Sequence, residues 1–99
     1  MIAYSSFFEL HCINKYKMDL SVEISKYPLN ENYIPVIQDF IDRLNTYKDL
    51  TVITNTMSTQ VFGKFDHVMD ALSKELKTSF AQEIKQVMVM KFINGDLRP

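Results

Sequence analysis

Two polar stretches of the sequence carry residue types that could recognise a small molecule. In the first, residues 18–29, Glu23 and Ser25 stand two positions apart within an alternation of apolar and polar residues. Strict alternation is typical of a β-strand with one buried face, and it places both polar side chains on the other face, about 6.6 Å apart. A carboxylate and a hydroxyl on one face of a strand can recognise a small polar molecule.

The second stretch, residues 55–63, supplies the complementary groups. Its amide and hydroxyl side chains can donate hydrogen bonds, and Met57 offers a polarizable surface. We interpret the two stretches as one site, with Tyr27 as an aromatic wall. The candidate ligand-binding residues are Glu23, Ser25, Tyr27, Asn55, Met57, Ser58 and Thr59.

Most of these residues also have a purely structural interpretation. Glu23 can pair with Lys91, and Asn55 and Ser58 are common turn residues. Thr59 can satisfy backbone groups at a strand edge, and Met57 can fill a core. The sequence leaves these alternatives open.

Composition limits the class of protein. The chain has 99 residues, which is one domain, and a formal net charge of -1, which gives no field toward nucleic acid or an anionic membrane. Cys12 is the single cysteine, so no intramolecular disulfide forms, and a reducing, cytoplasmic location is expected. Its neighbour His11 has no companion ligands, so we predict neither a metal nor a cofactor.

The order of predicted elements is strand, helix, strand, strand, helix, strand. Strands are expected at residues 18–29, ending at Pro28, and at 50–54, 59–64 and 86–93. The first helix runs from about residue 34 to 44, with Pro35 in its first turn. Asp66 is the expected N-cap of the second helix, which pauses near residues 78–79 and resumes to Ile84. Residues 1–17 form an extra segment before the domain at 18–99.

This order is the split βαβ pattern of a ferredoxin-like α+β fold, a four-stranded antiparallel sheet with both helices on one face. The last strand is apolar almost throughout, which predicts that both of its faces are covered. The other sheet face carries Ile53, Phe62 and either the Val87/Val89 or the Met88/Met90 pair. A patch of that kind usually meets a partner, so we predict a homodimer or homotetramer.

Two groups of motifs resemble one known family. Residues 23–29 (EISKYPL) followed by 33–37 (YIPVI), and residues 57–63 (MSTQVFG) followed by 65–71 (FDHVMDA), are similar to the YkoF-type thiamine/hydroxymethylpyrimidine-binding family. The E-x-S-x-x-P and T-x-x-x-G signals are also similar to a related thiamine-binding family once described as a domain of unknown function. The resemblance covers residues 18–93 and leaves out residues 1–17.

The resemblance implies a ferredoxin-like protein that binds thiamine or its pyrimidine without transforming it, in transport, salvage or sensing. The aminopyrimidine needs an acceptor for its amine, donors for its ring nitrogens and apolar surface for its faces. Glu23, Ser25 and Ser58 suit the polar contacts, and Tyr27 and Met57 suit the walls.

Two other classes of function remain open. The first is an oligomeric interaction or regulatory module that uses the same fold without this ligand. The second is a small enzyme, which we do not predict, because the two histidines have no acid partner evident in the sequence and there is no Gly-rich phosphate loop.

Overall fold

The computed structural model of the chain describes residues 18–29, 31 and 33–99. The expected extra segment, residues 1–17, lies outside them. The elements are β1 (Asp19–Pro28), α2 (Tyr33–Leu44), β2 (Thr51–Thr54), β3 (Thr59–Lys64), α3 (Phe65–Phe80) and β4 (Gln86–Asn94).

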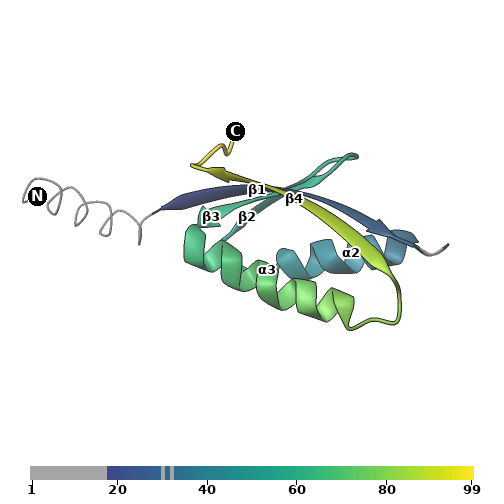
Figure 1. The fold of residues 1–99 in the computed structure, drawn as a ribbon. Coiled ribbons are helices and arrows are strands. Elements are labelled where there is room, and N and C mark those ends of the chain that lie inside the picture. The colour runs from purple at the N-terminus through teal and green to yellow at the C-terminus, as the bar shows by residue number, and fades with distance from the viewer. Residues whose placement is uncertain (1–17, 30, 32) are drawn as a thin grey trace, which may run out of the picture.

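The described strands form one four-stranded sheet in the order β2-β3-β1-β4, and each neighbouring pair is antiparallel. Both helices cover the same face of this sheet, and the C-terminal end of the chain lies on the opposite side (Figure 1). This arrangement confirms the predicted ferredoxin-like α+β fold. The face without helices is called the open face below.

The alternation in β1 divides the sheet into a core face and a polar face. Leu20, Val22 and Ile24 are at most 4% exposed and pack against the two helices. The intervening residues of β1 therefore point to the open face. The buried cluster around these three residues contains Phe40, Leu44, Leu50, Val61, Val68, Ala71 and Leu72.

The predicted start and end of the second helix were wrong, whereas the first helix is as predicted. The N-cap of α3 is Lys64, which makes no side-chain capping hydrogen bond, so Asp66 lies inside the first turn. The helix runs without a pause through residues 78–79, where Ser79 is fully buried, and it ends at Phe80 rather than Ile84. The helix α2 spans Tyr33–Leu44, which confirms the predicted helix with Pro35 in its first turn.

The prediction that both faces of the last strand are covered was also wrong. Met88 and Met90 pack against the core on the helix side, whereas no helix of this chain covers the open face of β4 (Figure 1). Val87 and Val89 are 49% and 47% exposed on the open face. They are therefore the pair that contributes to the apolar part of that face, together with Ile93.

Gly63 allows a close approach between β3 and the segment before β2. A Cβ added at this position would lie 2.7 Å from Leu50 Cδ2 and 3.3 Å from both the Asp49 carbonyl oxygen and Val68 Cγ2. We therefore expect Gly63→Ala to lower the free energy of unfolding by about 1–3 kcal/mol through overpacking. Urea denaturation measures this change, and Ser73→Ala on the exposed side of α3 is the control. Equal stability of Gly63→Ala and wild type would contradict the packing described.

Candidate functional site

Glu23 lies at the centre of the open face, because β1 is an inner strand and Gln60 and Lys91 flank this residue on β3 and β4. The Lys91 Nζ lies 3.6 Å from Glu23 Oε1, so the ion pair considered from the sequence is present. The Ser58 hydroxyl donates to Glu23 Oε2 at 3.3 Å. The carboxylate therefore lies between a cation and a hydroxyl that come from opposite sides of β1.

A hollow of about 490 Å³ opens beside Glu23, between the end of β1 and the turn that joins β2 to β3. Ser25 and Tyr27 line it from β1, and the Tyr27 side chain is 55% exposed. Met57 is 86% exposed at the rim. The hollow therefore offers a carboxylate, hydroxyl groups and the largely exposed side chains of Tyr27 and Met57. Its full lining is Glu23, Ser25, Tyr27, Asn55, Thr56, Met57, Ser58 and Lys91.

Asn55 shapes the turn that forms one side of the hollow. Its Oδ1 accepts hydrogen bonds from the backbone N–H groups of Met57 at 2.8 Å and of Ser58 at 2.9 Å. The Asn55 N–H donates to the Ser58 carbonyl at 3.0 Å. This is the Asx-turn pattern that makes asparagine common in turns, so the Asn55 oxygen is already engaged within the protein.

Thr59 does not join the other candidate residues. It pairs with Ile24, so its side chain points to the helix side of the sheet while Glu23 and Ser25 point to the open face. Thr59 is 6% exposed, and its hydroxyl lies 3.3 Å from that of Thr54. The predicted grouping of Thr59 with Glu23 is therefore corrected.

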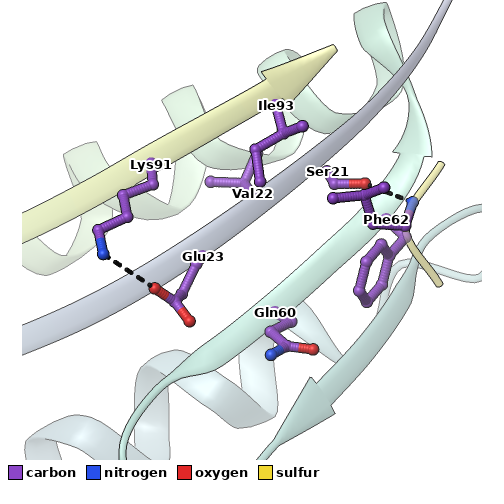
Figure 2. A pocket seen from close by; sticks show the side chains of 8 residues that line it. Ser21, Val22, Glu23, Gln60, Phe62, Lys91 and Ile93 are labelled. Carbon is purple, nitrogen blue, oxygen red and sulfur yellow. Dashed lines mark hydrogen bonds and ion pairs between the residues drawn. The ribbon is translucent and has the colours of Figure 1, made fainter. Parts of the chain in front are cut away.

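A second hollow of about 300 Å³ occupies the other end of the open face (Figure 2). Glu23 and Lys91 point toward one another at its edge, and Gln60 lies on the other side of Glu23. The C-terminal segment closes the far end, because the Ser21 hydroxyl donates to the Gly95 carbonyl at 2.6 Å and accepts the Leu97 N–H at 3.0 Å. The sequence did not reveal this second hollow, since its walls depend on which strands flank β1.

Lys26 points to the helix side of the sheet, away from Glu23. Its Nζ donates to the Val36 carbonyl and to the Ser79 hydroxyl, both at 3.3 Å, and lies 4.7 Å from the centre of the Phe40 ring. Burial and the nearby Arg43 guanidinium lower the pKa of Lys26 to about 8. The amine therefore belongs to the packing between the sheet and α2 rather than to the open face.

Arg43 connects the two helices beneath this lysine. Its Nε lies 2.7 Å from Glu75 Oε1 and its Nη2 donates to the Ser79 hydroxyl at 2.6 Å. Tyr47 donates to Glu75 Oε2 at 2.5 Å, and this hydrogen bond is the main reason that the pKa of Tyr47 rises to about 12. These groups satisfy one another, so they hold α2 and α3 together.

Two further features concern other classes of site. Among residues 18–29, 31 and 33–99, no group of three or more His, Cys, Asp or Glu side chains is placed to hold a metal ion. His67 Nδ1 lies 3.1 Å from Asp49 Oδ2, an acid partner that the sequence did not reveal. This pair lies before β2 and at the start of α3, whereas the hollow beside Glu23 lies at the opposite end of β2.

No helix in the described part of the chain is long and apolar enough to cross a membrane.

Comparison with known proteins identifies one family model. The model described as YKOF-related family matches residues 19–95. A comparison with curated proteins gave no match.

Several solved structures share the fold. A Streptococcus pneumoniae protein has a TM-score of 0.70 at 24% identity, covering 81% of this chain and 90% of its own. A hypothetical protein of Methanocaldococcus jannaschii has a TM-score of 0.67 at 23% identity, covering 82% of this chain and 84% of its own. A Thermotoga maritima protein, provisionally described as a thiamine biosynthesis or salvage protein, has a TM-score of 0.66 at 18% identity, covering 81% of this chain and 84% of its own.

The low pKa of Lys26 predicts a pH-dependent contribution to stability. The unfolded chain holds a proton on this amine up to about pH 10.5, whereas the folded chain releases it near pH 8. Stability therefore rises with pH across this window, because the unfolded state binds more protons there. We expect wild type to gain about 1–2 kcal/mol relative to Lys26→Met between pH 7.5 and 10.5, less than full linkage because the amine is partly solvated.

Urea denaturation of both proteins at several pH values measures this difference. Lys74→Met, on the exposed side of α3, is the control and is expected to show a flat difference from wild type. A flat difference for Lys26→Met as well would contradict the desolvated position of this amine.

Proposed function

The chain belongs to the YKOF-related family, and we propose that it binds thiamine or the hydroxymethylpyrimidine part of thiamine without transforming it. Such a protein serves thiamine transport, salvage or sensing. The provisional description of the Thermotoga maritima structure is consistent with this proposal.

One observation carries the proposal: six of the seven candidate residues chosen from the sequence line a single hollow, with Thr59 the exception. The space beside β1 is lined by residues from before α2 and from after it in the sequence. Those before α2 are Glu23, Ser25 and Tyr27, and those after it are Asn55, Met57 and Ser58. The hollow has about the size of small-ligand pockets, near 300–1,000 Å³.

The chemistry of this hollow suits an aminopyrimidine. The Glu23 carboxylate can accept from an exocyclic amine, and the Ser25 and Ser58 hydroxyls can donate to ring nitrogens. Tyr27 and Met57 can cover the faces of a flat ring. Lys91 competes with a cationic ligand for Glu23, but its side chain is 73% exposed and can move into solvent.

The proposed role is binding rather than catalysis. Around the hollow the described side chains include no histidine, cysteine or metal-binding cluster. Acyl or phosphoryl transfer needs a nucleophile with an adjacent base, or a preorganised anion cradle. Beside Glu23 the Ser58 hydroxyl does meet a carboxylate, at 3.3 Å, but Lys91 also engages that carboxylate, so we assign these groups to hydrogen bonding with a ligand.

We also propose that the protein assembles as a homodimer or homotetramer. Val87, Val89 and Ile93 are each more than 40% exposed on the open face, and β4 is a nine-residue strand at the sheet edge. Long apolar edge strands are usually covered in native proteins.

Light scattering coupled to size exclusion is expected to give an oligomer for wild type, and Val89→Lys is expected to shift it toward monomer. A monomeric wild type at millimolar concentration would contradict this assembly.

An oligomeric interaction module without this ligand is the second candidate function, and the same apolar surface favours it. The two functions differ in what a change at Glu23 does. In a ligand-binding protein Glu23→Gln weakens binding and leaves assembly intact. In an interaction module neither wild type nor Glu23→Gln binds the ligand.

We expect Glu23→Gln to bind hydroxymethylpyrimidine about tenfold more weakly than wild type. The substitution removes the charge that accepts the ligand amine, and a hydrogen bond to a charged group contributes about 1.5–3 kcal/mol. Isothermal titration calorimetry measures the affinity. Glu83→Gln, an exposed carboxylate in the segment between α3 and β4, is the matched control and is expected to bind like wild type. No heat from wild type at millimolar ligand would reject the proposed function.

A further inference from the structure

The first strand has a free backbone edge where it faces the candidate site. β1 pairs with β4 from Leu20 to Pro28, but its pairing with β3 ends at Ile24, opposite Thr59. Residues 25–28 therefore have a strand on one side only. On the other side they face the turn between β2 and β3, across a gap in the sheet.

The hydrogen bonds at the two ends of β1 show which backbone groups point into this gap. The Asp19 carbonyl accepts from the Gly95 N–H at 3.1 Å, and the Leu29 N–H donates to the Lys85 carbonyl at 2.8 Å, both on the β4 side. The Met18 carbonyl accepts from Phe65 on the β3 side at 2.9 Å. In an antiparallel ladder both backbone groups of a residue point the same way and successive residues alternate.

This alternation assigns the even-numbered residues of β1 to the β3 side. The register with β4 is continuous from Leu20 to Pro28, so no bulge changes the order. The N–H and C=O of Lys26 therefore point into the gap, while those of Ser25 and Tyr27 bond to β4. Among the described residues, no strand continues the β3 ladder opposite Lys26.

The turn keeps the gap open by engaging the amide that would otherwise fill it. Continuing the β1–β3 register by two residues places Met57 opposite Lys26. The Met57 N–H donates instead to Asn55 Oδ1 at 2.8 Å, so it is not offered to the Lys26 carbonyl. The hollow beside Glu23 on the open face and another of about 240 Å³ on the helix side both border this gap, since Ser25, Tyr27 and residues 55–58 line each of them.

We propose that the backbone of Lys26 reads the edge of a flat heterocycle that carries an amine next to a ring nitrogen. The carbonyl accepts from the amine and the N–H donates to the ring nitrogen, so the ligand takes the place of the missing β3 partner. Extended peptides use the same free-edge pairing when they bind to sheets. The second N–H of the amine is then left for the Glu23 carboxylate, next to Ser58 on the open face. This inference rests on the proposed function and specifies how its ligand is recognised.

A proline at position 26 tests the donor directly. Lys26→Pro removes an N–H that faces the gap and leaves the β4 ladder, which uses the neighbouring residues, intact. Lys26→Ala removes the same side chain and keeps the N–H, so it is the matched reference. By calorimetry with hydroxymethylpyrimidine, Lys26→Pro is expected to bind at least tenfold more weakly than Lys26→Ala. Circular dichroism confirms that both variants are folded.

Two measurements keep the inference testable should Lys26→Pro fail to fold. In the ligand-free wild type, the Lys26 amide is expected to exchange hydrogen at least tenfold faster than the Ser25 and Tyr27 amides. Asn55→Ala frees the Met57 amide to pair with the Lys26 carbonyl, so we expect it to weaken ligand binding about threefold or more. Asn55→Asp keeps the side-chain acceptor for the Met57 amide, so we expect it to bind the ligand like wild type.

The outcomes separate this inference from the proposed function. Binding by wild type with equal affinities of Lys26→Pro and Lys26→Ala overturns the backbone contact alone. A Lys26 amide as protected as its neighbours shows that the gap is closed, and it also overturns the inference. The absence of binding by wild type overturns the proposed function and the backbone contact together.

Discussion

The alternation of side chains along β1 determines both the core of this fold and the position of its candidate site. Leu20, Val22 and Ile24 bind the sheet to both helices, and the residues between them must then face the open side. A shift of one residue in register would bury Glu23 and expose the core side chains. The burial that stabilises the fold therefore also fixes the carboxylate at the centre of the open face.

The candidate site arises where one ladder is shorter than the other. β4 follows β1 to Pro28, whereas β3 leaves it after Ile24 because the turn is closed by Asn55. The hollow beside Glu23 on the open face and the hollow of about 240 Å³ on the helix side both lie next to the part of β1 that β3 does not pair with. Binding groups on loops and strand ends, held by a rigid sheet, are a common way to build recognition sites.

The element order and the face of Glu23 could be predicted from the sequence, because period-two alternation and helical periodicity are local signals. The position of Thr59 could not, since Ser58, Thr59 and Gln60 are all polar and only the pairing with Ile24 shows which face each takes. Which face of β4 is exposed could not be predicted for a similar reason: its sequence is apolar on both sides, and only the pairing with β1 shows that Val87 and Val89 lie on the open face. Tertiary pairing decides these features.

We propose that a flat heteroaromatic ligand occupies the gap between β1 and the β2–β3 turn. The most direct measurement is the amide chemical-shift map of isotopically labelled wild-type protein titrated with hydroxymethylpyrimidine. If the ligand binds there, the shifts are expected to be saturable and largest for Lys26 and for residues 57 and 58. Shifts confined to the hollow near Ser21 and Leu97, or no shifts at millimolar ligand, would contradict it.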